Sequence, residues 1–218
     1  MRLGIFGGTF DPINLGHLRL AEEAREQIRL DRVLFVPNNV SPFKTGRTVT
    51  PGQVRLEMVQ RAVADNPHFG ASAVEVERAG PSYTIDTVRA LRGEYGPDAD
   101  LFLITGADAV RDLPAWREPD ALLALLAGIA TAARPGTDRQ AVLGALPAPW
   151  AARVTFIAMP ALDISATDVR ARAANGRSIR YLVPAPVAAL IDAHGWYRAT
   201  AGVPDATVLR APRKETAA

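Results

Sequence analysis

The chemistry-bearing residues of this chain begin at its N-terminus. The stretch GIFGGTFDP at positions 4–12 is followed by NLGH at positions 14–17. An apolar strand that breaks at two glycines and leads into a helix would bring backbone N–H groups, a helix N-terminus and the His17 imidazole together. Such a place suits a phosphate group, because the amides point outward and the helix dipole favours negative charge. Taken alone, Gly7-Gly8-Thr9 is equally compatible with an ordinary strand-to-helix turn.

A second candidate phosphate site lies far downstream, at ISATDVR in positions 164–170. At the start of a helix, the hydroxyls of Ser165 and Thr167, the free N–H groups and the Arg170 guanidinium would fall within one helical turn. Hydroxyls, amides and a guanidinium together form a cradle for an anion. The same residues also predict a capped helix start, and the two roles are compatible.

The first stretch resembles a known motif. Its spacing differs from a dinucleotide-binding G-x-G-x-x-G loop, and the chain has no G-x-x-x-x-G-K-[ST]. It is similar to the first motif of the nucleotidyltransferase superfamily, in which G-x-[FY]-[GD]-[GP]-[ST]-F-D-P precedes [HT]-x-G-H. His17 matches the second histidine, whereas Asn14 stands where that superfamily has His or Thr. ISATDVR resembles the superfamily's [IV]-S-[AS]-[ST]-x-[IV]-R motif, which holds the β- and γ-phosphates of ATP.

The middle of the chain resembles the bacterial nicotinate-nucleotide adenylyltransferases. VPNNVSPFK at positions 36–44 resembles a loop where an Asn and a basic residue face phosphate, although Phe43 stands where relatives often have His. GPSYTIDT at positions 80–87 is similar to that family's S-Y-T-x-D-T signature. Gly106-Ala107-Asp108 with Trp116 resembles its G-x-D…W segment, and RPG at positions 134–136 its R-P-G. The resemblance runs from residue 3 to about residue 197.

This resemblance implies adenylyl transfer from ATP to nicotinate mononucleotide, with Mg²⁺ arriving on ATP and no metal site on the protein itself. The catalytic residues that it implies are His17, Lys44 and Arg170. The ATP-binding residues that it implies are Gly8, Thr9, Phe10, Asn14, His17, Gly106, Asp108, Ile164, Ser165, Thr167 and Arg170. Those for the mononucleotide are Asn39, Lys44, Tyr83, Thr84, Trp116 and Arg134.

Other interpretations stay open. A phosphopantetheine or nicotinamide mononucleotide adenylyltransferase would share the first and last motifs. Asn14 favours a catalytically weak nucleotide-binding relative, because an amide can donate a hydrogen bond but carries no charge. If Asn14 is tolerated, Asn14→His should keep or raise turnover. A class I aminoacyl-tRNA synthetase fragment would need a K-M-S-K-S loop, which is missing. Tyr83 and Trp116, taken singly, are also compatible with core aromatics, although an indole face suits a pyridine ring.

The elements that must position these residues alternate between strand and helix patterns. Strands are expected at positions 3–6, 32–37, 73–76, 100–105, 128–132 and 154–157. Helices are expected at 16–30, from a capping box at 50–53, at 84–95, 165–175 and 186–194. The alternation predicts an α/β fold: a Rossmann-like, doubly wound, mainly parallel sheet with helices on both faces and ligands at the carboxyl ends of the strands. We expect one domain over residues 1–198 and a flexible tail over 199–218.

The composition excludes several classes of protein. The 218 residues are 48% hydrophobic and 22% charged with a net charge of +2, which is typical of a globular protein. The absence of cysteine excludes disulfides, thiolate metal sites and a cysteine nucleophile. No apolar run of about 18 residues and no signal peptide are visible, so we expect a cytoplasmic protein without a membrane partner. No lysine-rich run suggests nucleic-acid binding, and we expect a monomer or small homo-oligomer.

Overall fold

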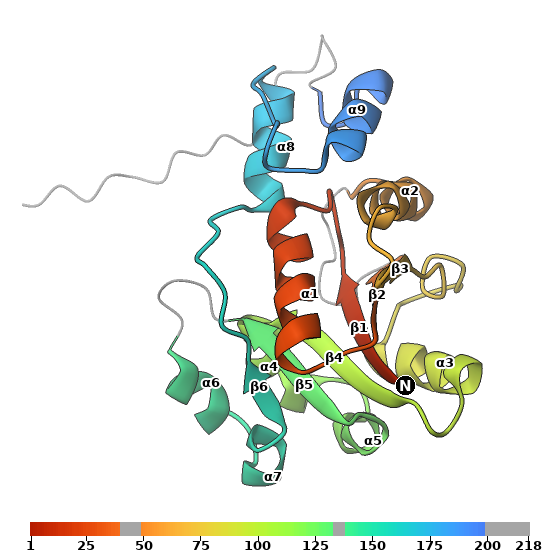
Figure 1. Ribbon diagram of the computed structural model, residues 1–218, viewed down its shortest axis with the longest axis vertical. Helices are drawn as coiled ribbons and strands as arrows, with labels where there is room; N and C mark the ends of the chain where they lie inside the picture. The colour runs from red at the N-terminus through yellow and green to blue at the C-terminus, as the bar shows by residue number, and fades with distance from the viewer. Residues whose placement is uncertain (40–48, 133–137, 199–218) are drawn as a thin grey trace, which may run out of the picture.

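The computed structural model describes residues 1–39, 49–132 and 138–198, and a parallel six-stranded sheet forms its centre (Figure 1). The strand order is β3-β2-β1-β4-β5-β6. The strands are β1 (Arg2–Gly8), β2 (Arg32–Pro37), β3 (Phe69–Ala71), β4 (Asp100–Gly106), β5 (Gly128–Ala132) and β6 (Val154–Phe156). All five strand pairs are parallel, so the predicted Rossmann-like, doubly wound sheet is confirmed.

Alternating side chains along the strands build a hydrophobic core on each face of the sheet. Phe6 and Phe35 belong to one core, which packs against α1 (Leu15–Gln27), α2 (Gly52–Val63), α8 (Ala166–Ala174) and α9 (Ala185–His194). Ile5 and Leu34 belong to the other, which packs against α3 (Thr84–Tyr95), α4 (Ala107–Arg111), α5 (Pro119–Leu125) and α6 (Arg139–Gly144). Since β2 and β4 flank β1, the chain reverses its direction across the sheet at β1, and a ligand crevice is expected there.

The third strand lies earlier in the chain than the sequence pattern predicts. Residues 73–76, expected as a strand, form a turn in which the Glu77 N–H donates to the Ala73 carbonyl at 2.9 Å. The observed β3 is a short edge strand paired with β2. The prediction is wrong because a short run that includes buried residues resembles a strand in sequence even when a turn buries them. Here the turn, and not a sheet, buries Glu75 and Val76.

The predicted capping box at the start of α2 is also wrong. Pro51 is the N-cap residue, and among the described residues no side chain caps this helix. Met58 and Ala62 are buried on the inward face of this helix. The sequence reading also missed α4, α5, α6, η1 (Leu113–Ala115) and α7 (Ala148–Ala151). These helices are short, and a periodicity of 3.6 residues is difficult to detect over so few positions.

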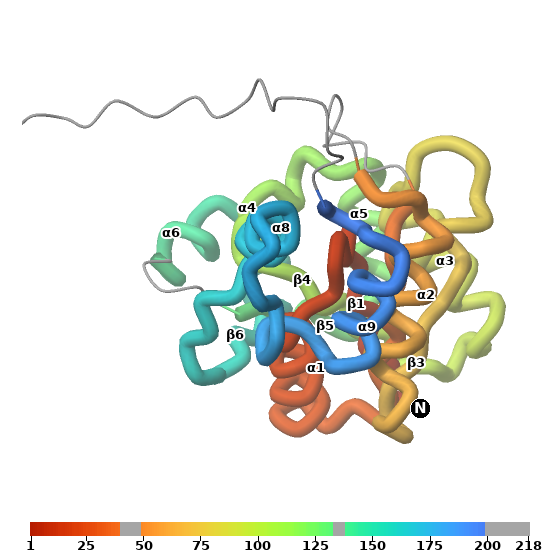
Figure 2. Tube along the Cα trace, turned by 90° about the horizontal axis from the view of Figure 1, so that it is seen from above, coloured from red at the N-terminus to blue at the C-terminus, as the bar shows by residue number. Residues whose placement is uncertain are grey.

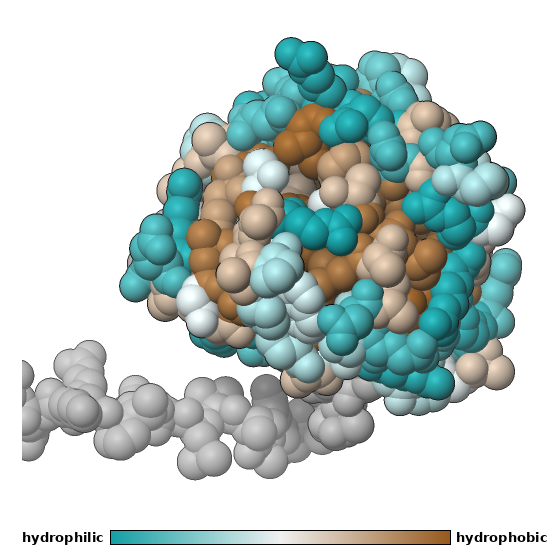
Figure 3. Space-filling view, turned by 90° about the horizontal axis from the view of Figure 1, so that it is seen from below, coloured by the Kyte–Doolittle hydropathy of each residue, from teal (hydrophilic) through white to brown (hydrophobic). Residues whose placement is uncertain are grey.

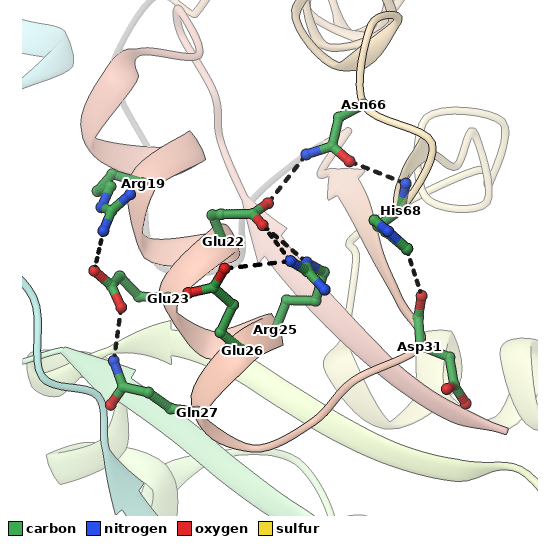
Figure 4. A network of polar contacts seen from close by, with 9 residues as sticks. All are labelled: Arg19, Glu22, Glu23, Arg25, Glu26, Gln27, Asp31, Asn66 and His68. Atoms are coloured by element: carbon green, nitrogen blue, oxygen red, sulfur yellow. Dashed lines mark hydrogen bonds and ion pairs between the residues drawn. The ribbon is translucent and has the colours of Figure 1, made fainter.

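Polar side chains on α1 tie this helix to its neighbours (Figure 4). Glu22 accepts hydrogen bonds from Arg25 and, at 3.0 Å, from the Asn66 side chain beyond α2. The Arg25 hydrogen bond holds the pKa of Glu22 below its ordinary value. Gln27 bonds both the N–H and the carbonyl of Ala158, at 2.9 and 2.6 Å. These bonds therefore hold the segment between β6 and α8 against α1.

The C-terminal helices α8 and α9 lie over the carboxyl ends of the strands, as the view from above shows (Figure 2). The Leu15 N–H at the start of α1 donates to the Leu182 carbonyl ahead of α9 at 2.9 Å. The opposite end, seen from below, presents hydrophobic surface between hydrophilic margins (Figure 3). In the described part of the chain, no helix is long and apolar enough to cross a membrane. Positions 199–218, predicted as a tail, lie outside the described residues.

Candidate active site

The turn after β1 is shaped for close approach of a ligand. A Cβ atom added to Gly7 would meet nothing within 4 Å, so it would project into open space rather than into protein. One added to Gly8 would lie 2.9 Å from the Phe10 ring, which would have to shift. Phe10 itself adopts a left-handed backbone conformation with φ of 47°. Glycine at both positions leaves the end of β1 open and lets Phe10 fold back over it.

Asn14 and His17 cap the start of α1 reciprocally. The Asn14 side chain accepts from the His17 N–H at 3.2 Å, and His17 Nδ1 accepts from the Asn14 N–H at 3.1 Å. Because Nδ1 is an acceptor, the neutral imidazole carries its hydrogen on Nε2. The ring packs edge-on against Phe10, with 5.2 Å between ring centroids. Asn14, which departs from the superfamily motif, thus fixes the tautomer and orientation of His17 through its backbone and caps the helix through its side chain.

Helix α8 brings the second motif to the same place. Ser165 caps the helix by accepting from the Asp168 N–H at 3.0 Å. Arg170 donates to the carbonyl of Asp11 at 2.6 Å and to the Thr167 hydroxyl at 3.2 Å. A cavity of about 260 Å³, here called the α8 cavity, lies between the turn and α8. Its lining includes Thr9, Phe10, Asn14, His17, Ile164, Ser165, Thr167 and Arg170.

A wide cavity of about 690 Å³ opens beside the α8 cavity. Phe10, Asn14, His17 and Ile164 line both cavities. Further lining comes from the ends of β4 and β5, the first residue of α6 and the segment ahead of α8: Gly106, Ala132, Arg139, Met159, Pro160, Ala161 and Leu162. Its volume falls in the ordinary range for a small-molecule site. Being less polar than the α8 cavity, the wide cavity suits an uncharged ring system.

A third cavity of about 240 Å³, here called the α3 cavity, lies on the other side of Gly7 and Gly8. Thr84, the first residue of α3, and the half-buried Trp116 line it. The other polar residues of its wall are Thr9, Asn38, Glu75, Ser82, Thr87 and Thr105. The α3 cavity therefore combines an indole, a helix N-terminus and several hydroxyl groups.

Glu75 is a buried carboxyl group in the wall of the α3 cavity. The Thr87 hydroxyl donates to it at 2.6 Å and in turn accepts from Arg78 at 3.1 Å. Burial raises the pKa of Glu75 above its ordinary value, and the hydrogen bond from Thr87 opposes this rise only in part. The network anchors the first turn of α3 to the segment that follows β3.

Comparison with known proteins identifies the family. Residues 5–172 match the Cytidylyltransferase-like family. A probable nicotinate-nucleotide adenylyltransferase from Thermomicrobium roseum is 48% identical over 199 residues, which cover 90% of this chain and 92% of that protein. Another from Thermus thermophilus is 46% identical over 198 residues, or 91% of this chain and 100% of that protein. The chain belongs to the nicotinate-nucleotide adenylyltransferase family.

Solved structures match the fold of this chain. The Plasmodium falciparum nicotinic acid mononucleotide adenylyltransferase complexed with NaAD has a TM-score of 0.72 at 17% identity, covering 90% of this chain and 97% of that one. A putative nicotinate-nucleotide adenylyltransferase from Vibrio parahaemolyticus has a TM-score of 0.63 at 18% identity, covering 91% and 96%. At such low identity the likeness concerns the fold alone.

Most residues predicted for the adenylyltransferase site come together, and some do not. All eleven predicted ATP residues except Asp108 line the wide or the α8 cavity. The Asp108 side chain is 78% exposed and lies 3.6 Å from Arg111. Among the described residues, Tyr83 and Asn39 also lie outside the three cavities. Lys44 and Arg134 fall outside the described residues, and their roles stay predictions.

The sequence patterns did not indicate two buried charged residues near the site, Glu75 and Arg55. Glu75 was hidden in the false strand at 73–76, and Arg55 lies on the inward face of α2. Arg55 is spaced three, four and seven residues before the buried Met58, Val59 and Ala62. The signal that could have revealed Arg55 is a charged residue on an apolar helical stripe. Such a residue is buried only where polar groups are placed to form hydrogen bonds with it.

Proposed function

We propose that this chain transfers the adenylyl group of ATP to nicotinate mononucleotide and releases pyrophosphate, the activity for which its relatives are named. One observation carries the proposal: the three cavities meet at the carboxyl end of β1. Gly7 and Gly8 line both the wide and the α3 cavities, and Thr9 lines both the α3 and the α8 cavities. A group held above these residues is reachable from all three sides.

Each substrate part has a cavity of matching chemistry. The adenosine would occupy the wide cavity, and the β- and γ-phosphates the polar α8 cavity with Ser165, Thr167 and Arg170. The pyridine ring would lie in the α3 cavity, with Trp116 as its platform and Thr84 at the helix N-terminus near the carboxylate. This placement brings the α-phosphate and the mononucleotide phosphate together over the glycines.

The reaction is an in-line displacement at phosphorus. An oxygen of the mononucleotide 5′-phosphate attacks the α-phosphorus, the bond to the bridging oxygen breaks, and pyrophosphate leaves with the bonding electron pair. His17 donates from Nε2 to the phosphate oxygens as negative charge builds on them. Backbone N–H groups at Phe10 and the start of α8 act in the same way. Positioning and charge stabilisation thus supply the catalysis without a covalent intermediate.

Magnesium belongs to the substrate, as MgATP. In the described part of the chain, no three His, Cys, Asp or Glu side chains gather as a metal site. The only carboxylate in the wall of the α8 cavity, within that part, is Asp11, and it already accepts a hydrogen bond from Tyr197 at 2.7 Å. The donor set therefore fits an ion held mainly by phosphate oxygens and water, which neutralises phosphate charge.

Pyrophosphate release tests this function directly. ATP and Mg²⁺ are supplied with nicotinate mononucleotide, nicotinamide mononucleotide or phosphopantetheine in separate reactions. We expect release with nicotinate mononucleotide and little with the other two. Release with phosphopantetheine alone would move the chain to another reaction of the superfamily. If no pyrophosphate is released with any of the three acceptors while ATP still binds, the chain is a nucleotide-binding relative without turnover. We take residues 1–198 as the unit that performs the reaction.

A further inference from the structure

The guanidinium of Arg55 is buried beneath the junction of the three cavities. Arg55 is 1% exposed, and it has acceptors for all five of its N–H groups. Its three short hydrogen bonds reach the backbone carbonyls of Thr9 at 2.6 Å, Asn38 at 2.6 Å and Thr50 at 2.7 Å. Two longer contacts, of 3.3 and 3.5 Å, reach the Asn39 carbonyl and the Asn38 side chain.

These acceptors belong to separate segments of the site. Thr9 is in the turn that lines the α8 and α3 cavities, and Asn38 follows β2 in the wall of the α3 cavity. Thr50 precedes α2. One planar, rigid group therefore sets the distance between the turn on the ATP side and residues 38–39 on the mononucleotide side.

The hydrogen bond to Thr9 also orients an amide. In a planar trans peptide the carbonyl oxygen and the following N–H point in opposite directions. The Thr9–Phe10 bond is trans, and its oxygen is held against Arg55. The Phe10 N–H must therefore point away from Arg55, and Phe10 lines both the wide and the α8 cavities. Arg55 so fixes the direction of a phosphate-binding donor without touching the ligand.

The charge of Arg55 is balanced locally. Burial lowers its pKa, and the nearby Asp11 carboxylate opposes that shift. Tyr197, whose own pKa is raised by burial, stays protonated and donates to Asp11 at 2.7 Å. Asp11 is in the same turn, with its carbonyl bound by Arg170. The turn is thus held from below by one arginine and from α8 by another.

We propose that Arg55 is a positioning residue that holds the turn at Thr9 and residues 38–39 in one fixed arrangement, so that the two reacting phosphates meet in line. The proposal rests on the proposed adenylyl transfer. An Arg55→Lys substitution would keep the charge but lose the fork that spans three carbonyls. We expect kcat/KM for adenylyl transfer to fall on the order of 10²-fold, mainly in kcat, because displacements of about 1 Å have such effects.

Arg92 offers a matched control at the opposite end of the sheet. This half-buried arginine also bonds several backbone carbonyls, including Pro97 at 2.9 Å and Leu125 at 2.7 Å. Arg92→Lys and Arg55→Lys should both lower Tm, because both lose bonds to backbone carbonyls, but Arg92→Lys should change kcat by no more than about twofold, because Arg92 lies far from the site. Folded Arg55→Lys protein with the kcat of the unaltered chain would overturn the proposal. If the unaltered chain itself does not turn over, the proposed function fails instead.

If Arg55→Lys does not fold, amide hydrogen exchange of the unaltered chain provides a second test of the proposal. With inorganic tripolyphosphate as the probe, exchange should slow at the Phe10 N–H and also at the Asn39 N–H, which donates to the Ser82 hydroxyl at 3.3 Å. The Gly96 N–H beside Arg92 should be unaffected. Protection of Phe10 without any at Asn39 would overturn the positioning role. Absence of protection at Phe10 would count against the phosphate site and hence the proposed function.

Discussion

The two halves of this site are built in different ways. On the ATP side, the capping bonds of the turn after β1 and of the N-terminus of α8 each span three residues, and Arg170 joins these two segments. On the mononucleotide side, the α3 cavity is held by contacts across the chain, such as Asn39 to Ser82 and Thr87 to Glu75. Locally coded groups are visible in a sequence, whereas groups assembled from distant segments are not.

Two aromatic residues predicted at the mononucleotide site illustrate the difference. Tyr83 lies under the Arg117 guanidinium, 4.7 Å from the ring centroid, and packs on the core. Trp116, thirty-three residues further along, also packs on this core, but it lines the α3 cavity as well. The S-Y-T-x-D-T signature predicts Tyr83 as a mononucleotide contact, and the G-x-D…W segment predicts Trp116. The resemblance found the region, and packing decided which ring faces the cavity.

Removal of the His17 imidazole should have the largest effect on the ATP side. His17→Ala should lower kcat on the order of 10²-fold or more, because it removes a preorganised donor that stabilises developing charge. Steady-state pyrophosphate release measures the effect. His68→Ala, which alters a ring in the surface network of Figure 4, is the control and should leave kcat unchanged. Equal turnover of His17→Ala and the unaltered chain would contradict the assignment.

Asn14 can be used to separate capping from charge. Asn14→Asp keeps a side-chain acceptor at the N-cap, where negative charge is favourable, but places that charge beside the triphosphate. We expect Tm to hold and KM for ATP to rise about tenfold through repulsion. Asn14→Ala should instead lose about 1 kcal/mol of stability with the cap. An unchanged KM in Asn14→Asp would mean that ATP does not approach α1. That Asn14→His keeps turnover stays a prediction.

The mononucleotide side should respond more weakly to a single change. Trp116→Ala should raise KM for nicotinate mononucleotide about fivefold, with KM for ATP unchanged, because it removes one stacking surface. Tyr83→Phe should leave both constants as they are, since the Tyr83 ring packs on the core. Initial rates with each substrate varied in turn provide the measurement. A larger effect from Tyr83→Phe than from Trp116→Ala would reverse the two rings' roles.

The buried carboxyl of Glu75 should make stability depend on pH. Its folded-state pKa is raised from the ordinary 4.5, so its contribution to stability is full below that value and is lost as pH rises through the folded-state pKa. Glu75→Gln stays neutral and should gain up to a few degrees of Tm over the unaltered chain as pH rises through this window. Exposed Glu77→Gln should show no such trend. Parallel Tm profiles for all three would contradict a raised pKa.

The sequence by itself determined the parts of this protein that depend on neighbouring residues. The turn at positions 7–10, the cap of α8 by Ser165 and the bounds of β2 and β5 follow from local patterns, and the structure agrees. The parallel sheet also followed, because alternating strands and helices allow few arrangements. The motifs then placed the chain in its family.

Tertiary structure alone decided how these parts meet. In the structure the third strand is Phe69–Ala71 rather than 73–76, and Asp108 and Tyr83 lie outside the cavities. Arg170 contacts Asp11, which is 159 residues away in the chain. The tertiary structure also placed Arg55 among carbonyls from three segments. A buried guanidinium is stable only where the whole fold supplies its acceptors. That condition depends on packing between distant segments, which no local pattern in the sequence encodes.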